Sequence, residues 1–204
     1  MGEIRKGRQT PTQSVVLPYS STYGAEAIDI YNSTGRTAQG WQELLLSDIL
    51  AVNEEGLWVH TKFGYSVPRR NGKNEIVAIR EMYGLKKGER ILHTAHRTTT
   101  THSAWERLSN LLKKANIEVV SSYKAFGKEH LEVAGGGIIE FRTRTSKGGL
   151  GEGFDLLIID EAQEYQDDQE SALKYVVTDS KNPQTIFCGT PPTPVSSGTV
   201  FTKF

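Results

Sequence analysis

Residues 62–84, KFGYSVPRRNGKNEIVAIREMYG, combine an extended run, a basic loop and a helix-forming run. Aromatic and β-branched residues favour a strand over KFGYSV, and EIVAIREMYG has the pattern of a helix. Between them, Gly72 and Lys73 stand where a phosphate-binding loop carries Gly-Lys, but Val67 replaces its first Gly and Asn74 its Ser or Thr. The loop is therefore either a nucleotide site or a basic surface turn.

The position of this loop favours an anion site. Successive backbone amides and the N-terminus of the following helix would point at one anion, and Lys73 would reach the β- and γ-phosphates of a nucleotide. The loop residues expected to contact ATP are Pro68, Arg69, Arg70, Asn71, Gly72, Lys73 and Asn74.

A second motif supports the first. The run LLIIDE, residues 156–161, places Asp160 and Glu161 at the end of a buried strand. An Asp that holds Mg²⁺ and an acid that orients the attacking water are the other half of a nucleotide-hydrolysing site. Adjacent acids can also mark a helix start. Because both motifs occur in the right order, we interpret them as one ATP site, with Thr190 of CGTPP near the γ-phosphate.

Strands and helices alternate along most of the chain, which predicts an α/β fold with a mainly parallel central sheet and helices on both faces. Ligands of such sheets bind beyond the carboxyl ends of the strands, where both motifs fall. Helices are expected near 40–50, 74–88, 101–116 and 168–180, and strands near 56–67, 90–96, 117–124, 130–136, 137–145, 154–160 and 184–190.

Composition sets broad limits. The 204 residues, 37% hydrophobic, fit one large domain, and 24 Lys plus Arg balance 24 Asp plus Glu, so nucleic-acid contacts must come from local clusters. A single cysteine, Cys188, rules out an internal disulfide. No segment has the pattern of a secretion signal or a membrane span, so we expect a cytosolic protein without a membrane partner. Residues 1–40 are expected to form an irregular arm and 41–204 the ATPase domain.

Five motifs together resemble the large terminase subunits of tailed bacteriophages: GWQELL, VPRRNGKN, ILHTAHRTTTTHSAW, LLIIDEAQ and CGTPP, between about residues 40 and 195. The resemblance implies a P-loop ATPase that uses ATP and Mg²⁺ to drive double-stranded DNA into a capsid. It also implies a homo-oligomeric ring in the active state, with a monomer in isolation as the alternative. A portal protein and a small terminase subunit are the implied partners, and the cytoplasm of the infected bacterium is the implied location.

Residue roles follow from the same resemblance. The loop of that family commonly lacks the first Gly and carries an Arg, which Arg69 matches, with Arg70 as the alternative. Gln42 resembles the glutamine that reads the adenine edge, and a surface glutamine is the other interpretation. Glu161 resembles the catalytic acid and Thr190 the coupling residue. Asn74 departs from the pattern, offering an amide oxygen to Mg²⁺ beside Asp160.

The family also implies an arginine that acts on the neighbouring subunit. FRTRTSKGGLGEG, residues 141–153, offers Arg142, Arg144 and Lys147, and Arg144 is preferred because it lies nearer the Gly-rich loop. The alternative is that these residues solvate a hairpin or contact DNA. A C-terminal nuclease domain, which full terminases carry, is not expected in this chain.

Other functions remain open from the sequence. DEAQ also resembles the acidic motif of two-lobed helicases, and a nucleotide-gated assembly module would bind ATP with negligible turnover. His93, His96 and His102 are close in sequence, but without a Cys pair we do not expect a metal site there.

Overall fold

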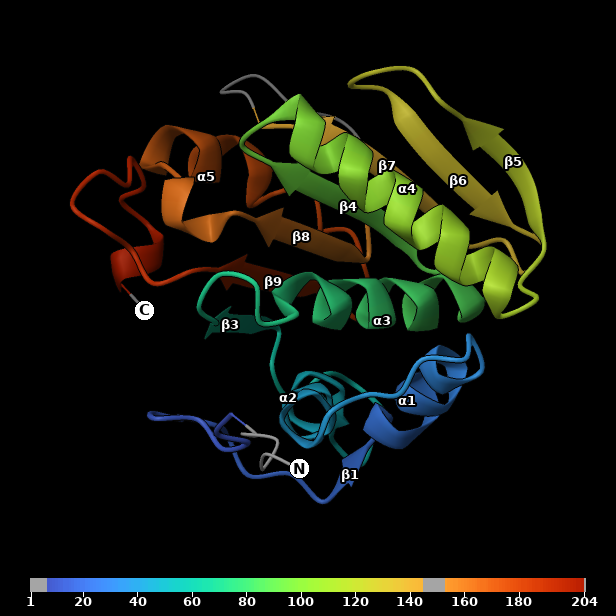
Figure 1. The fold of residues 1–204 in the computed structure, drawn as a ribbon, viewed down its shortest axis with the longest axis horizontal. Helices are drawn as coiled ribbons and strands as arrows, with labels where there is room; N and C mark the ends of the chain where they lie inside the picture. The colour runs from blue at the N-terminus through green and yellow to red at the C-terminus, as the bar shows by residue number, and fades with distance from the viewer. Residues whose placement is uncertain (1–6, 145–152, 204) are drawn as a thin grey trace, which may run out of the picture.

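The computed structural model describes residues 7–144 and 153–203, and within them a seven-stranded sheet forms the centre of the fold (Figure 1). Its strand order is β3-β9-β8-β4-β7-β6-β5. The pairs from β3 to β7 are parallel, whereas β6 and β5 extend the sheet as antiparallel strands. The expected α/β fold with a mainly parallel sheet is confirmed.

The strands have the following bounds: β3 Lys62–Ser66, β4 Arg90–Ala95, β5 Val119–Tyr123, β6 Glu129–Val133, β7 Ile138–Thr143, β8 Leu156–Asp160 and β9 Gln184–Gly189. Every residue of β8 and of β9 is buried. Burial on both faces accounts for their continuous apolar sequences, as expected for central parallel strands.

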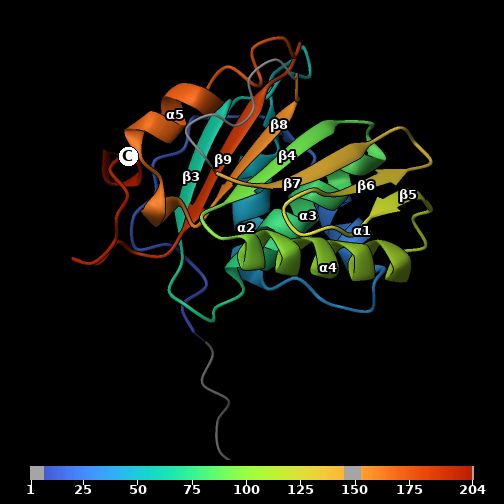
Figure 2. The same cartoon turned by 90° about the horizontal axis from the view of Figure 1, so that it is seen from above.

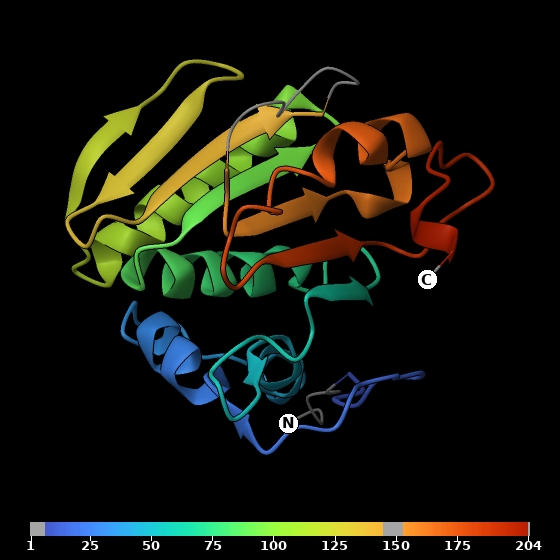
Figure 3. The same cartoon turned by 180° about the vertical axis from the view of Figure 1, so that it is seen from behind.

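Helices cover both faces of the sheet. The helices α3, Lys73–Lys86, and α4, Thr98–Lys114, lie on one face, and α5, Asp167–Leu173, lies on the other (Figures 2 and 3). Under α3 pack α1, Gly24–Asn32, and α2, Gly40–Ile49. Short 3-10 turns follow β8 (η1, Ala162–Glu164) and precede the C-terminus (η2, Phe201–Lys203).

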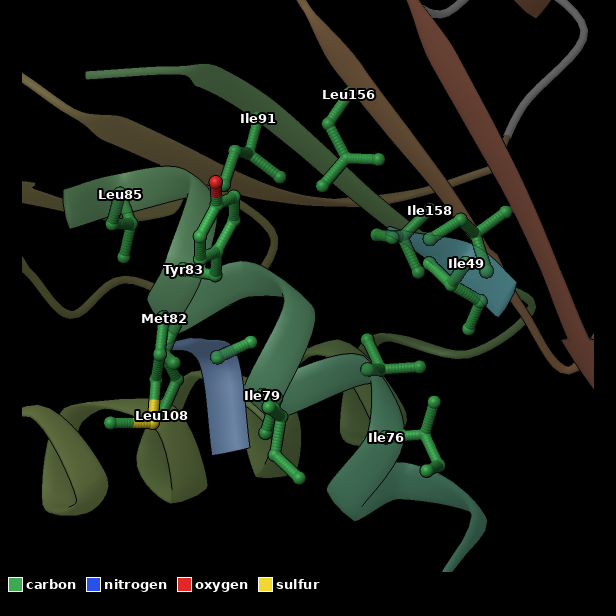
Figure 4. Packing of buried hydrophobic residues seen from close by; sticks show 14 of the residues in the cluster. Ile49, Ile76, Ile79, Met82, Tyr83, Leu85, Ile91, Leu108, Leu156 and Ile158 are labelled. Carbon is green, nitrogen blue, oxygen red and sulfur yellow. The ribbon is translucent and has the colours of Figure 1, made fainter. Parts of the chain in front are cut away.

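The main hydrophobic core lies between α3 and the sheet (Figure 4). Ile76, Ile79 and Met82 of α3 are fully buried, as are Ile91 of β4 and Ile158 of β8. The spacing of the α3 residues gives the helix an apolar stripe that packs on the sheet. This packing fixes the start of α3 at the carboxyl ends of the strands, the edge where the predicted site residues fall.

The N-terminal segment differs from the expectation. Residues 7–20 contain no helix or strand, but the irregular arm expected over 1–40 is wrong at α1 and at a short strand, β1 (Ser21–Thr22), which pairs with β2 (Ala51–Val52). Ala27, Ile30 and Tyr31 are buried and join the main core. Their spacing makes α1 amphipathic, and this short helix is stabilised by packing against α2 and α3.

Two predicted elements are shorter than expected. The strand expected over 56–67 begins at Lys62, because Trp58 forms an isolated bridge with Val52 instead. The helix expected over 168–180 runs only from Asp167 to Leu173 and continues as turns. No helix of the described residues is long and apolar enough to cross a membrane.

Candidate active site

The loop from β3 to α3 has a constrained backbone. Arg70 has a φ of 65° and Gly72 a φ of 81°, both in the left-handed region. The side-chain amide of Asn71 donates to the carbonyl oxygens of Pro68, 3.2 Å, and Arg69, 3.0 Å. Left-handed backbone next to a helix start turns amides toward a common point, which is the geometry of an anion site.

Lys73 lies in the first turn of α3 and forms an ion pair with Asp160 at the end of β8. Burial alone would raise the pKa of Asp160, but the charges of Lys73 and His93 lower it below its ordinary value. Burial likewise opposes the charge of Lys73, but neighbouring negative groups, Asp160 among them, raise its pKa. The two side chains therefore hold each other charged.

The two acids of LLIIDE differ in their surroundings. Asp160 is 1% exposed, and its Oδ1 also accepts from the Glu161 backbone N–H at 2.7 Å and the Cys188 thiol at 3.3 Å. Glu161 has left-handed backbone, φ 53°, which is uncommon outside Gly and clusters at functional sites. Within the described residues its buried Oε2 has no hydrogen-bond partner. The hydrogen-bonding capacity of this carboxylate oxygen is therefore unused within the described chain.

Arg144 corrects an expectation. It is 5% exposed, and its guanidinium donates to the backbone oxygens of Thr94 at 3.2 Å, Asp160 at 2.5 Å and Glu161 at 3.2 Å. It also lies over the ring of Tyr165. Burial lowers its pKa, opposed by Asp160 and Glu161. The expected exposed position, offered to a neighbouring subunit, is wrong, because Arg144 instead joins the ends of β4 and β8 of its own chain.

A cavity of about 710 Å³ opens at the carboxyl ends of the strands. It brings together most of the residues that the sequence predicts for an ATP site: Pro68, Arg69, Arg70, Gly72, Lys73, Asn74, Asp160, Glu161 and Thr190. Arg69 and Arg70 are exposed, and their guanidinium groups have no hydrogen bond or ion pair within the described part of the chain. Their positive charge is therefore open to a polyanion.

Gln42 lies beside the loop and not in the cavity lining. It is 4% exposed, its Oε1 accepts from the Gln39 backbone N–H at 2.9 Å, and its Nε2 is 3.5 Å from the Gly72 oxygen. In this arrangement its amide caps α2 and contacts the loop. For Gln42 to contact adenine, its Nε2 would have to give up the 3.5 Å contact with the Gly72 oxygen.

Thr190 follows β9, which lies between β3 and β8 in the sheet, so it stands between the phosphate loop and the acids. Its backbone N–H donates to Gln163 Oε1 at 3.2 Å. The Gln163 backbone oxygen in turn accepts from Gly198 at 3.1 Å. Gln163 thus links the cavity to the C-terminal segment, and sequence reasoning missed it.

Further lining residues were missed as well: Glu75, His96, Arg97, Thr100, Arg107, Glu164 and Val195. Arg97 is the residue before α4, Thr100 lies in its first turn and Arg107 lies in its middle, at spacings of three and seven. That helical spacing places them on one face and could have identified them.

The sequence also singled out two further basic residues, Arg142 and Lys147, and a group of histidines. Arg142 is bonded to Glu140, and Lys147 lies outside the described residues. His93 and His102 contact different carboxylates, Glu81 and Glu129. Among residues 7–144 and 153–203 no group of three His, Cys, Asp or Glu side chains is placed to hold a metal alone.

The cavity fits a magnesium nucleotide by its donor set. Oxygen ligands suit Mg²⁺, which usually takes one or two carboxylates together with phosphate oxygens and water. Asp160 and Asn74 line the same cavity as Lys73 and would supply such oxygens. The unpartnered Glu161 Oε2 faces no competing protein donor in the described structure.

Comparison with known proteins finds no matching family model and no matching curated protein. Solved structures do match. The HK97 bacteriophage large terminase has a TM-score of 0.61 and 18% identity, over 82% of this chain and 37% of the terminase. The ATPase domain of the Thermus phage P74-26 large terminase has a TM-score of 0.61 and 14% identity, over 80% of this chain and 68% of the domain.

A large terminase from a thermophilic bacteriophage, solved in complex with ADP, also matches, with a TM-score of 0.53 and 11% identity over 63% of this chain and 33% of that protein. This chain thus spans well under half the length of the HK97 protein. At such identities the likeness establishes the fold. The chain has the fold of the ATPase domain of bacteriophage large terminases.

Proposed function

We propose that this chain binds and hydrolyses ATP in the cavity at the carboxyl ends of its parallel strands. The observation that carries the proposal is the convergence there of a phosphate-type loop with Lys73 and an acidic pair, Asp160 and Glu161, from distant parts of the sequence. A basic surface turn would not need a buried acid beside its lysine.

Phosphate binding begins with the loop. Its amides, the N-terminus of α3 and the exposed guanidinium of Arg69, with Arg70 as the alternative, favour a triphosphate. Lys73, now paired with Asp160, would turn to the β- and γ-phosphates. Breaking a buried pair is costly unless each partner finds another charge, and a bound magnesium nucleotide offers one to each.

Asp160 and Asn74 would hold Mg²⁺, which when bound neutralises charge on the phosphates. Asn74 replaces the usual hydroxyl with an amide oxygen. Gln42 would contact the adenine edge once its amide leaves the Gly72 oxygen.

Hydrolysis is assigned to Glu161. Its Oε2, which has no partner within the described chain, would accept a hydrogen bond from the attacking water and orient it. Arg144 fixes this acid by binding the backbone oxygens of Asp160 and Glu161. Thr190, bonded to Gln163, stands where a change at the γ-phosphate would reach the C-terminal segment.

Equilibrium binding and steady-state turnover test the site. Lys73→Ala should weaken ATP binding and abolish turnover, whereas Glu161→Ala should bind ATP and not turn it over. Lys113→Ala, exposed on α4 and outside the cavity lining, serves as a matched surface control. Wild-type turnover in either site variant would contradict the assignment.

We further propose that hydrolysis drives double-stranded DNA into a phage capsid, from a homo-oligomeric ring working with a portal protein and a small terminase subunit in the cytoplasm of the infected bacterium. The support is the fold shared with phage large terminases and the five motifs in their order. A helicase-like lobe and a nucleotide-gated assembly module are the alternatives.

DNA dependence separates these functions. A packaging motor should hydrolyse ATP faster with blunt double-stranded DNA than with single-stranded DNA of equal length, measured as phosphate released per chain. Stimulation by single strands alone would favour a helicase. Tight ATP binding with turnover no faster than that of Glu161→Ala would favour an assembly module.

A further inference from the structure

Two more ionisable side chains are buried beneath Asp160. Glu81 of α3 and His93 of β4 are each 1% exposed. His93 Nδ1 lies 2.5 Å from Glu81 Oε1, and its Nε2 lies 3.8 Å from Asp160 Oδ2. Burying such groups costs free energy that an apolar pair of similar volume would avoid. Their presence beside the acidic pair therefore calls for a reason other than packing.

The hydrogen bonds of Asp160 are unevenly distributed. Lys73, the Glu161 backbone N–H and the Cys188 thiol all donate to Oδ1. The other oxygen faces His93 Nε2, at a distance too long for a hydrogen bond. Within the described residues that nitrogen is buried and has no partner. A buried polar atom left unpaired at a functional site points to a partner it takes in another state.

We propose that His93, held by Glu81, positions Asp160 for its metal by taking over as donor when Lys73 turns to the nucleotide phosphates. This inference rests on the proposed ATP site. Once Lys73 turns away, the remaining donors to Asp160 Oδ1 are the Glu161 backbone N–H and the Cys188 thiol. A small rotation of the carboxylate would bring Oδ2 into hydrogen-bond range of His93 Nε2.

Glu81 orients His93 so that its Nε2 can replace Lys73 as the hydrogen-bond donor to Asp160. By accepting from Nδ1–H it fixes the ring plane and aims Nε2 at Asp160, because the two nitrogens lie on opposite sides of the imidazole. Donation from both nitrogens requires the imidazolium form of His93, which carries a proton on each and whose charge lies between the two carboxylates. The ring also packs on Phe141, with centroids 5.2 Å apart. A carboxylate–imidazole pair behind a metal-binding acid changes metal affinity, whereas a pair that only fills the core changes stability.

The test is the affinity of the full 204-residue chain for ADP, measured at equilibrium with and without Mg²⁺. We call the ratio of the two affinities the magnesium gain. His93→Phe keeps a flat ring and removes the donor, so the gain should fall about 10- to 100-fold while the affinity without Mg²⁺ stays the same. Glu81→Leu should do the same, and Glu81→Gln should retain most of the gain because its amide oxygen still accepts from Nδ1.

His102→Phe is the matched control, since His102 is bonded to the buried Glu129 at 2.8 Å but does not line the cavity. Its magnesium gain should equal that of the wild type. Thermal unfolding of each variant checks folding, and if His93→Phe does not fold, Glu81→Leu against Glu81→Gln decides the question.

Four results would overturn the inference. An unchanged magnesium gain in His93→Phe, or equal gains in Glu81→Leu and Glu81→Gln, would leave the ATP site standing and make His93 a core residue. A loss of affinity equal with and without Mg²⁺ would show general damage. A wild-type chain that binds no ADP would overturn the ATP site and this inference together.

Discussion

Arg80 and Glu81 are neighbours on α3 but enter two different buried clusters. Arg80 belongs to an amino-end cluster with Glu89 and Gln184, at the amino ends of β4 and β9. Glu81 belongs to a carboxyl-end cluster that comprises Lys73, Glu81, His93, Arg144, Asp160 and Glu161. Both clusters lie in the same domain and are largely buried. A difference in how their polar atoms are hydrogen-bonded therefore indicates a difference in function.

In the amino-end cluster every polar atom of the Arg80, Glu89 and Gln184 side chains has a partner, although Nε1 of Trp58, whose ring lies against Arg80, has none within the described chain. Arg80 donates to both Glu89 oxygens at 2.7 and 3.0 Å and to Gln184 at 2.9 Å, and Gln184 donates to the oxygens of Ile49 and His60. The carboxyl-end cluster leaves His93 Nε2, Arg144 Nε and Glu161 Oε2 unpaired within the described chain. We infer that the cluster whose polar atoms all have hydrogen-bond partners stabilises the fold, and that the cluster with three unpaired polar atoms binds a ligand.

The largest expected effect comes from replacing Asp160, the acid proposed to bind Mg²⁺. Asp160→Asn should lower the rate of Mg²⁺-dependent ATP hydrolysis on the order of 10³-fold, because several kcal/mol of transition-state charge stabilisation is lost. Its folding free energy should fall by only about 1.5–3 kcal/mol, since Lys73 can turn toward the cavity. Turnover assays and urea unfolding measure both; near-normal turnover would remove Asp160 from the site.

Arg80→Ala should show the reverse. Removing one partner of a buried, fully paired cluster should lower the free energy of unfolding by about 3–5 kcal/mol. Hydrolysis per folded molecule should stay near wild type, because Arg80 lies outside the cavity lining. If turnover per folded molecule collapsed while stability held, the division between the two clusters would fail.

Replacing Arg144 tests the role of this residue in the carboxyl-end cluster. Arg144→Ala should lower turnover by about 10- to 100-fold, since the loss of charged hydrogen bonds worth about 1.5–3 kcal/mol frees the backbone of Glu161. Because the guanidinium of Arg144 is bonded to backbone oxygens of its own chain, mixing Arg144→Ala with Glu161→Ala chains should restore no turnover. Recovery on mixing would return Arg144 to a role between subunits.

The smallest expected effect is on pH dependence. The pKa of Asp160 is lowered in the folded chain, so its contribution to stability is complete above its ordinary value of 3.8 and is lost as the pH falls through the folded value. The pKa of Lys73 is raised, so its contribution is lost only above 10.5. The stability difference between wild type and Asp160→Asn should be flat from about pH 5 to 9 and shrink below about pH 4. A difference that grows in acid would contradict the assigned pair.

The sequence predicted the parts of the site that follow from local pattern. Gly72 with Lys73 and Asp160 with Glu161 sit at strand ends, and parallel strands bring their carboxyl ends together whatever lies between. The length of α3 and its end near Gly88 also followed from pattern, since that residue has a φ of 82°.

What the sequence could not give were contacts between distant segments. Glu81 and His93 read as ordinary helix and strand residues, and their pairing depends on how α3 packs on β4. Arg144 was expected on an exposed edge loop because glycines follow it, yet the carbonyl oxygens of two other strands hold it buried. The helix α1 was missed because Ser, Thr, Gly and Pro surround its nine residues.

The most direct measurement of the central claim is single-turnover hydrolysis of labelled ATP, with the chain in excess, by wild type and Glu161→Gln. Glutamine keeps the shape of the side chain and removes the carboxylate. The account predicts that both bind ATP equally, and that product forms on the order of 10²- to 10⁴-fold more slowly in the variant. Equal rates of product formation would show that the carboxyl-end cluster is not the site of ATP hydrolysis.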